Sequence, residues 1–348
     1  MRQQRKADHI LIASQYADGA SSNGLENVHL INNSMPELNL EDIDLSVNFL
    51  GKKLEAPLLI NALTGGTEQA WSINRDLALL SRKHGLAMAV GSQTIAINVP
   101  ELRKTFAVAR DCNPDGVIIA NLGAGSDVEK AMEAVEMISA DALQIHFNVP
   151  QELAMSEGER KFKGLLENVK QIVQHCPVPV IAKEVGFGLS RETAKKLYGI
   201  GVRIFDIGGR GGTSFTFIED KRDGKFNNEF NDWGIPTAVS LGEIVSLELP
   251  VQLIASGGIR TAADAAKAIS MGADLVGIAG FFLKILLAQG FAGLDTKISE
   301  FKYRLRSAFL MTGSSNSKEI KQKPLVILGE TAEWLRARGV DPCTWAIR

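Results

Sequence analysis

From Pro57 onward, short apolar runs that end in small or polar residues alternate with longer segments of helical periodicity. The runs are rich in Val, Ile and Ala, which is typical of parallel strands buried on both faces. There are eight of them, at residues 57–66, 86–93, 117–123, 142–148, 178–188, 202–213 and 251–255 and in the run that ends at Ala279-Gly280. Eight such strand and helix units predict an α/β fold of the (β/α)₈ TIM-barrel type.

Residues 251–280 show the repeating unit most clearly. The run Val251–Ala255 breaks at Ser256-Gly257-Gly258, a helical stretch follows over Thr261–Met271, and a second apolar run ends at Ala279-Gly280. Glycines at strand ends let backbone N–H groups approach an anion, and a helix N-terminus adds partial positive charge. In (β/α)₈ barrels a phosphate site often follows the seventh and eighth strands, so we expect one here. Glycines that only cap the elements are the alternative interpretation.

We divide the chain into an N-terminal arm (1–54), a barrel (55–312) and a C-terminal extension (313–348) packed on the barrel. The arm is charged at its start and then rich in Ser, Asn and Gly, so it cannot form a core of its own and should pack over the barrel. The connection at 214–235 is long and polar, and we expect a loop there that shapes the pocket. The alternative, an open doubly wound sheet, is disfavoured because no GxGxxG follows the first strand.

Composition excludes several classes of protein. The 348 residues carry a net charge of −2, with 45% hydrophobic and 22% charged residues, so there is no basic field that would attract nucleic acid. The three cysteines lack the spacing of a disulfide framework or a zinc site. The N-terminus has no apolar signal segment, and no apolar stretch approaches membrane-spanning length. We therefore expect a cytoplasmic protein with no membrane partner.

Polar residues follow nearly every apolar run, and all strands of a parallel barrel end on one face, so these residues should converge. They are Asn61, Thr64, Ser92, Gln93, Asn121, His146, Asn148, Lys183, Glu184, Asp206, Thr213 and Ser256. A buried, hydrogen-bonded structural group is the favoured interpretation for Asn61 and Asp206. Lys183 differs, because a buried ammonium needs a partner or a chemical task. At a strand end it would stabilise an electron-rich ring or a developing anion.

The segment HFNVPQE after the fourth strand places His146, Asn148, Gln151 and Glu152 close together. Glu152 offers a ligand for a hard cation, beside neutral groups that hydrogen-bond or handle protons. One carboxylate does not form a dedicated metal cage. It suits Mg²⁺ held jointly with a substrate diphosphate, because Mg²⁺ keeps waters and bridges phosphates. A structural histidine and a solvated Gln–Glu pair are the alternatives.

The motifs INALTGG, VGSQ, ANLG, QIHFNVPQE, KEVGFG, GGRGGT, ASGGIR and GIAG occur in this order, after RKADH and before PLVILGE and WLRARG. In this the chain resembles the type 2 isopentenyl-diphosphate isomerases from arm to tail. The glycine motifs occur in many FMN barrels, whereas HFNVPQE together with the N-terminal RK is specific. The resemblance implies an FMN-dependent enzyme of isoprenoid biosynthesis that interconverts isopentenyl and dimethylallyl diphosphate. It also implies Mg²⁺, NADPH as the reductant of FMN, and a homo-oligomer, a tetramer or an octamer.

The same resemblance implies roles for individual residues. FMN would contact Leu63, Thr64, Gly65, Ser92, Asn121, Lys183 and Thr213, and its phosphate would lie on Gly257, Gly258, Ile259, Ala279 and Gly280. The substrate would be held by Arg5, Lys6, His9, Asn148 and Gln151, the catalytic residues would be Gln151, His146 and Lys183, and Glu152 would bind Mg²⁺. From composition alone, Arg5 and Lys6 form a solvated terminal cluster. Leu63 stands where the family often has Met, a volume-conserving change.

Three other functions are compatible with parts of this pattern. An FMN-dependent 2-hydroxyacid oxidase needs a His base beside a substrate-binding Arg, and GGRGGT has no adjacent His. An inosinate-type dehydrogenase needs a nucleophilic Cys in that loop, and none of the three cysteines lies there. A barrel that only binds a phosphate ligand would need neither Lys183 nor HFNVPQE.

Overall fold

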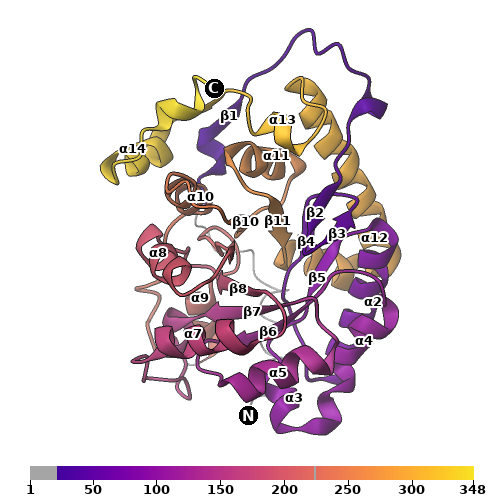
Figure 1. The fold of residues 1–348 in the computed structure, drawn as a ribbon, viewed down its shortest axis with the longest axis vertical. Helices are drawn as coiled ribbons and strands as arrows, with labels where there is room; N and C mark the ends of the chain where they lie inside the picture. Colours follow the sequence, from indigo (N-terminus) through magenta and orange to yellow (C-terminus); the bar gives the residue numbers. More distant parts are fainter. Residues whose placement is uncertain (1–21, 223–224) are drawn as a thin grey trace.

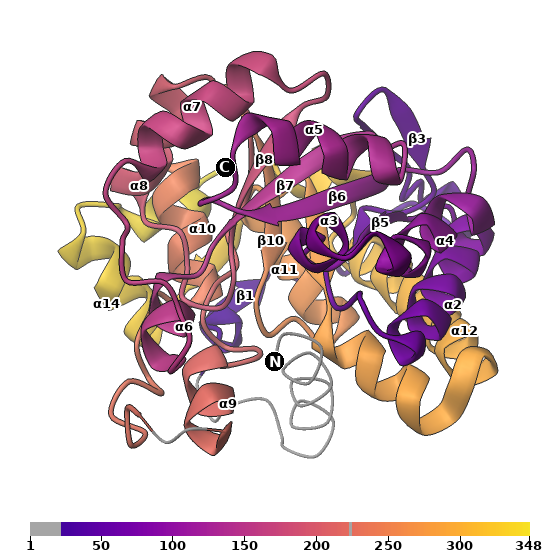
Figure 2. The same cartoon turned by 90° about the horizontal axis from the view of Figure 1, so that it is seen from below.

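The computed structural model describes residues 22–222 and 225–348, and its centre is a closed barrel of eight parallel strands (Figures 1 and 2). In order around the barrel, the strands are β4 (Leu58–Ile60), β5 (Ala87–Ala89), β6 (Ile118–Gly123), β7 (Ala142–Phe147), β8 (Val180–Glu184), β9 (Ile204–Asp206), β10 (Gln252–Ser256) and β11 (Leu275–Ile278). Each overlaps one of the eight runs expected to form strands. The TIM-barrel prediction is therefore confirmed.

Helices surround the barrel on its outer side. The longer ones are α2 (Glu68–His84), α4 (Lys104–Cys112), α5 (Val128–Met137), α7 (Leu165–His175), α8 (Arg191–Gly199), α10 (Thr237–Val245), α11 (Ala262–Met271) and α12 (Gly280–Met311). α11 shows how local sequence sets the ends of a helix. Thr261 and Asp264 form a reciprocal capping box at its start, and Gly272, with a φ of 132°, ends it. None of the helices within the described residues has both the length and the apolar character that a membrane crossing needs.

The interior of the barrel changes from apolar to polar along the strands. Successive strand residues point to opposite faces, so residues two apart share the interior. The apolar interior positions include Leu59, Ile119, Ala142, Ile181, Ile204 and Ile254. The positions two residues further along are Asn61, Asn121, Gln144, Lys183, Asp206 and Ser256, all of them buried. The apolar half fills the barrel, and the polar half forms a layer at the C-terminal ends of the strands.

A hairpin closes the N-terminal end of the barrel. Its strands, β2 (Val47–Phe49) and β3 (Lys52–Leu54), pair antiparallel. Phe49 and Leu54 are buried in the same cluster as the apolar interior positions. Large apolar side chains from the N-terminal region therefore cover the end of the barrel away from the polar layer.

The two ends of the chain pair with each other. β1 (Val28–Leu30) runs antiparallel to β12 (Leu325–Ile327), and Figure 1 shows β1, in indigo, beside the C-terminal segment in yellow. Leu25 and Val28 belong to the main core, so this part of the N-terminal segment packs over the barrel. The division into arm, barrel and extension stays a prediction. The remaining elements are η1 (Leu25–Asn27), η2 (Leu40–Asp42), α3 (Thr94–Asn98), η3 (Pro100–Leu102), α6 (Val149–Ala154), α9 (Phe215–Arg222), α13 (Ser317–Ile320), α14 (Gly329–Ala337) and η4 (Pro342–Trp345).

The connection at 214–235 differs from the loop expected there, because its first part forms the helix α9. Thr216, Ile218 and Glu219 of this helix are buried, and α9 packs against α6, as Figure 2 shows. Its sequence shows no clear apolar stripe, so hydrophobic periodicity did not predict a helix here. Tertiary packing rather than intrinsic propensity stabilises most helices in proteins, and α9 is an example.

Candidate active site

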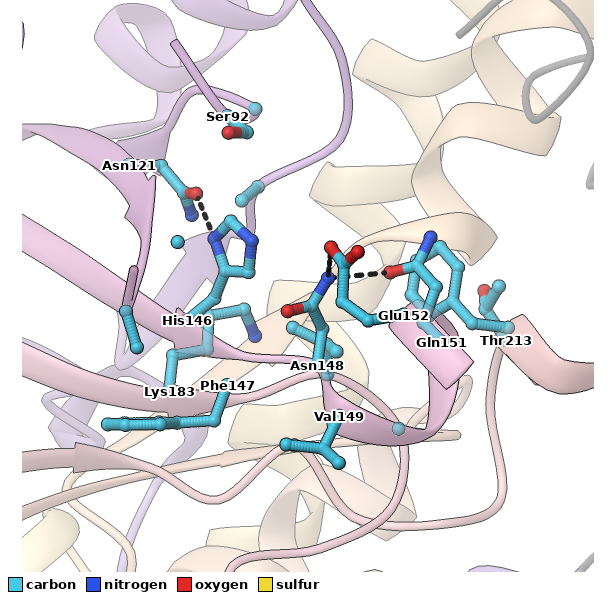
Figure 3. A pocket seen from close by; sticks show the side chains of 18 of the residues that line it. Ser92, Asn121, His146, Phe147, Asn148, Val149, Gln151, Glu152, Lys183 and Thr213 are labelled. Carbon is cyan, nitrogen blue, oxygen red and sulfur yellow. Dashed lines mark hydrogen bonds between the residues drawn. The ribbon is translucent and has the colours of Figure 1, made fainter. Parts of the chain in front are cut away.

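A cavity of about 980 Å³ lies at the C-terminal ends of the barrel strands (Figure 3). The described residues with an expected role that line it are Leu63, Thr64, Ser92, Asn121, His146, Asn148, Gln151, Glu152, Lys183, Thr213, Gly257, Gly258, Ile259, Ala279 and Gly280. Gly65 is not part of the lining, and a Cβ at this residue would lie only 2.0 Å from the ring of Phe106. Arg5, Lys6 and His9 lie outside the described residues. Side chains from all around the barrel are thus brought to one space.

The glycine turn after β10 is formed by close contacts between backbone segments. Gly257 and Gly258 have φ angles of 112° and 70°, which L side chains rarely adopt. A Cβ on Gly257 would lie 2.0 Å from the carbonyl oxygen of Gly209, and one on Gly258 would lie 2.2 Å from that of Gly211. Glycine is therefore required at both positions, which leaves backbone rather than side chain exposed to a ligand.

The N-terminus of α12 lies at the same cavity. Ala279 is the N-cap residue and provides no side-chain cap, and both Ala279 and Gly280 line the cavity. The first N–H groups of a helix lack partners within it, and the helix dipole adds partial positive charge at this end. Together with the glycine turn after β10, this arrangement fits a phosphate group.

One residue missed by the sequence reasoning supports the glycine turn. The side-chain amide of Asn23 donates to the carbonyl oxygen of Gly258 at 2.8 Å, and its backbone carbonyl accepts from the N–H of Ala238. Asn23 therefore fastens the start of the described chain to the expected phosphate site. Its sequence neighbourhood is polar and irregular, so no local pattern distinguishes it.

Lys183 has a buried partner. Its Nζ lies 2.9 Å from Oδ2 of Asp206, and the side chains are 10% and 0% exposed. Asp206 is therefore the partner that the buried ammonium of Lys183 was expected to need. Lys183 lines the cavity and Asp206 does not, so the cationic member of the pair is the one at the cavity.

Thr64 adds a group that suits a bound ligand. Its hydroxyl is buried and has no hydrogen-bond partner within the part of the chain that the structure describes. Buried polar atoms are nearly always paired, so an unpaired one in a cavity indicates a polar ligand atom. The cavity thus combines the unpaired hydroxyl of Thr64 and the ammonium of Lys183 with what we call the phosphate seat, which is Gly257, Gly258 and the N-terminus of α12. These groups fit a flavin mononucleotide.

The polar layer is a continuous hydrogen-bonded network. Asp206 accepts from the amide of Asn61 at 2.7 Å, from that of Gln144 at 3.3 Å and from the hydroxyl of Ser256. Gln144 in turn accepts from Asn121 at 3.1 Å, and the Oδ1 of Asn121 lies 2.9 Å from Nδ1 of His146. Sheet register explains the contacts, because Asn121 lies opposite Gln144 and Lys183 opposite Asp206 in neighbouring strands.

The HFNVPQE segment forms the end of β7 and the start of α6. Asn148, the N-cap residue of α6, donates through Nδ2 to Glu152 at 2.9 Å and to Gln151 at 3.4 Å (Figure 3). The second carboxylate oxygen of Glu152 accepts from the backbone N–H of Glu159 at 2.8 Å. In residues 22–222 and 225–348, no group of three or more His, Cys, Asp or Glu is arranged to hold a metal ion. Glu152 would therefore bind a divalent cation only together with a ligand.

Glu219 of α9 is a second residue that the sequence reasoning missed. It is fully buried, accepts from Nε2 of Gln151 at 3.3 Å and pairs with Arg222. The sequence presented it only as one charge in a polar connection. Its i, i+3 spacing with Arg222 on a helix was the available signal. Glu219 fixes the orientation of the Gln151 amide from outside the cavity lining.

Glu184 follows Lys183 on β8 but points to the other face of the strand. Its carboxylate accepts from the backbone N–H groups of Phe187 at 2.6 Å and Gly188 at 3.1 Å. Burial raises the pKa of Glu184 to about 7, although backbone N–H groups, that of Phe187 foremost, and the charge of Lys183 act in the opposite direction. The carboxyl group therefore holds the turn 185–188, part of which lines the cavity.

The closed barrel and the match to a family model define the class of protein. The family model described as FMN-dependent dehydrogenase matches residues 101–327 of the chain. Within that class, sequence relatives identify a narrower family. The isopentenyl-diphosphate delta-isomerase of Moorella thermoacetica is 50% identical over 97% of this chain and 97% of its own length. That of Symbiobacterium thermophilum is 46% identical over 98% and 97%. The chain belongs to the isopentenyl-diphosphate delta-isomerase family, which confirms the resemblance found in its motifs.

Solved structures support the fold. Mandelate oxidase with (S)-2-phenylpropionate superposes with a TM-score of 0.67 at 17% identity, covering 93% of this chain and 98% of the other. A mandelate oxidase mutant with the monooxide FMN adduct has a TM-score of 0.66 at 16% identity, with coverage of 92% and 96%. At this identity the likeness concerns the barrel alone.

Proposed function

We propose that this protein interconverts isopentenyl diphosphate and dimethylallyl diphosphate, using reduced FMN and Mg²⁺. The observation that carries the proposal is one cavity that joins a phosphate seat and a buried lysine to the Asn148, Gln151 and Glu152 group. The full-length relatives named isopentenyl-diphosphate delta-isomerase support the same reaction. In it a proton is added to the terminal CH₂ carbon and another is removed two carbons away, so the double bond moves without net oxidation.

The chain would hold FMN with groups from several strands. The phosphate would lie on Gly257, Gly258 and the N-terminus of α12, and Thr64 would supply its unpaired hydroxyl. When bound, reduced FMN supplies a nitrogen that gives or takes a proton. The ammonium of Lys183 would favour an electron-rich ring beside it. The other proposed FMN contacts are Leu63, Gly65, Ser92, Asn121, Thr213, Ile259, Ala279 and Gly280.

The substrate would lie on the α6 side of the cavity. Glu152 would bind Mg²⁺ jointly with the diphosphate, and Asn148 would orient both. Gln151, held by Glu219, and His146, held by Asn121, would position the substrate or move a proton. Arg5, Lys6 and His9 are proposed to bind the diphosphate as cationic groups.

Three further features belong to the proposal, and the motif resemblance supports them. They are NADPH as the source of reducing equivalents, a homo-oligomeric state (tetramer or octamer) and a cytoplasmic role in isoprenoid biosynthesis. Anaerobic flavin reduction by NADPH or NADH tests the first, and size-exclusion chromatography with light scattering tests the second.

Turnover in deuterium oxide tests the reaction itself. Purified protein should be yellow, and anaerobic photoreduction with Mg²⁺ should start isomerisation, with solvent deuterium incorporated into dimethylallyl diphosphate. Lactate and mandelate, with oxygen present, serve as the comparison for a 2-hydroxyacid oxidase. Peroxide formation from either acid without isomerisation, or protein that binds no flavin, would contradict the proposal.

A further inference from the structure

We propose that Gln144 is a positioning residue that fixes which nitrogen of His146 carries the proton. A chain of buried hydrogen bonds runs from Asp206 through Gln144 and Asn121 to the imidazole. Its donors and acceptors are ordered in one direction, so that neutral His146 is protonated on Nδ1 and presents Nε2 as an acceptor. The inference rests on the proposed function only for the catalytic meaning of this tautomer.

The chain is anchored at one end by groups whose polarity cannot reverse. Asp206 is ion-paired with Lys183 at 2.9 Å, and an ionised carboxylate only accepts hydrogen bonds. The backbone N–H of Ala62 donates to Oδ1 of Asn61 at 2.8 Å, and a backbone N–H only donates. The amide of Asn61 must therefore direct its oxygen to Ala62 and its NH₂ to Asp206, where Nδ2 lies 2.7 Å from the carboxylate.

Gln144 continues the same order of donors and acceptors from Asn61 and Asp206 to Asn121. Its Nε2 lies 3.1 Å from Oδ1 of Asn61 and 3.3 Å from Oδ2 of Asp206, both of them acceptors. The NH₂ of Gln144 must therefore face this side, which leaves its Oε1 for the amide of Asn121 at 3.1 Å. Gln144 is fully buried, and Asn61 and Asn121 are 2% and 3% exposed, so water has little access with which to reverse the order.

His146 is the last member of the chain. Because Asn121 directs its NH₂ to Gln144, its Oδ1 faces Nδ1 of His146 at 2.9 Å, and that nitrogen must carry a proton. Figure 3 shows the ring with Nδ1 toward Asn121 and its other nitrogen on the opposite side. His146 lines the cavity, and in the neutral ring the nitrogen that faces away from Asn121 is then an acceptor. With the amides reversed, the same atom would be a donor.

The tautomer matters because it sets the direction in which His146 can act. With Nε2 unprotonated, the ring accepts a hydrogen bond or takes up a proton from a ligand, and Nδ1 stays bonded to Asn121 throughout. Gln144 is outside the cavity lining and does not contact His146, so it acts on the imidazole only through Asn121.

Nitrogen NMR of histidine tests the inference in the FMN-bound protein. The chain has five histidines, and His146→Asn identifies the His146 signals by their loss from ¹⁵N-histidine-labelled protein. Spectra are recorded at alkaline pH, since an unperturbed imidazole with a pKa of about 6.5 is neutral there. The expected wild-type pattern is a protonated Nδ1 and an unprotonated Nε2. A protonated Nε2 would overturn the proposal without any variant.

Three variants separate positioning from general packing. In Gln144→Met the ratio of the Nδ1 to the Nε2 tautomer should fall by roughly tenfold, which corresponds to about 1.4 kcal/mol, because Asn121 is then free to turn. Gln144→Glu should keep the wild-type pattern, since one carboxyl oxygen still accepts from Asn121. The other oxygen is buried between the acceptors Asn61 and Asp206, so the carboxyl group holds its proton there and donates as Nε2 does. The matched control is Gln93→Met. Gln93 is also fully buried, but its side chain bonds Asn121 only at the backbone N–H and not at the side-chain amide, so the tautomer should not change.

The outcomes distinguish this inference from the proposed function. An unchanged tautomer ratio in Gln144→Met, or an equal change in Gln93→Met, would overturn the positioning role. If Gln144→Met does not fold, the wild-type and Gln144→Glu spectra still decide. A protein with the predicted tautomer but no isomerase activity would refute the function and leave the inference standing.

Discussion

Replacing the two members of the Lys183–Asp206 pair should have unequal effects on stability. Asp206→Asn leaves the ammonium of Lys183, whose side chain is only 10% exposed, without its counter-charge. It also replaces one carboxylate oxygen, which accepts hydrogen bonds from Asn61, Gln144 or Ser256, by an NH₂ group that can only donate. Removing one partner of a buried pair costs about 3–5 kcal/mol, because the remaining charge is uncompensated. We expect Asp206→Asn to lose at least this much.

Lys183→Met should cost less. The carboxylate of Asp206 keeps its bonds from Asn61 at 2.7 Å, from Gln144 and from Ser256, so its charge remains solvated by protein. The loss is then that of one hydrogen bond between charged groups, about 1.5–3 kcal/mol. The order of the two variants, rather than either value, is the prediction.

Urea unfolding of flavin-free protein measures both variants, since bound FMN would add its own stabilisation. Lys52→Met is the matched control: Lys52 lies 2.7 Å from Asp141, but its side chain is 37% exposed, so we expect a loss of at most about 1 kcal/mol. A larger loss from Lys183→Met than from Asp206→Asn would refute the reasoning, because it would mean that Asp206 is not held by its neutral donors.

The remaining predictions concern the phosphate seat, the metal ligand and a buried carboxyl group. Gly257→Ala should weaken FMN binding roughly tenfold to hundredfold, measured by flavin fluorescence, because the φ of 112° at this residue is strained for alanine. Gly125 lines the same cavity and has open space where a Cβ would lie, so Gly125→Ala should bind FMN normally. Equal losses of affinity in the two variants would contradict this prediction. Glu152→Gln keeps the shape of the side chain but removes its charge, so the Mg²⁺ concentration for half-maximal activity should rise more than about tenfold. Glu157 lines the same cavity and lies 3.5 Å from Arg222, and Glu157→Gln should leave the titration unchanged. Burial raises the pKa of Glu184 from 4.5 to about 7, so between these values the folded protein binds more protons than the unfolded one. Stability should therefore fall as pH rises from 4.5 to 7, by about 3 kcal/mol. In Glu184→Gln the urea midpoints at about pH 5 and about pH 8 should differ less than in the wild type, and identical pH dependence would remove Glu184 as the cause.

Local patterns in the sequence predicted the barrel well, because each strand carries its own signal. The run 142–148 is apolar, ends in polar residues and forms β7 (Ala142–Phe147). The helix expected at Thr261–Met271 forms with Thr261 as its cap. Strand and helix signals of this kind depend on neighbouring residues only, so they can be found without knowing the fold.

The same reasoning failed where a residue acquires its role from a distant partner. Asn61 and Asp206 were expected to be buried, hydrogen-bonded structural groups, and this is confirmed, but their bonds to each other and to Gln144 could not be predicted from the sequence. Gln144 carried no signal in the sequence, and Glu219 carried only its i, i+3 spacing with Arg222, because Asn121 and Gln151, which they contact, lie 23 and 68 residues away along the chain.

By itself, the sequence determined the eight strands, the glycine turns and the family to which the chain belongs, since periodicity, turn residues and motifs are local properties. Only the tertiary structure decided which polar residues share a hydrogen bond and in which direction it points. The reason is that closure of the barrel brings polar residues from separate strands into one buried layer, where each donor must find an acceptor. The polarity of that layer, from Asp206 to His146, is a property of the closed barrel and of no single segment.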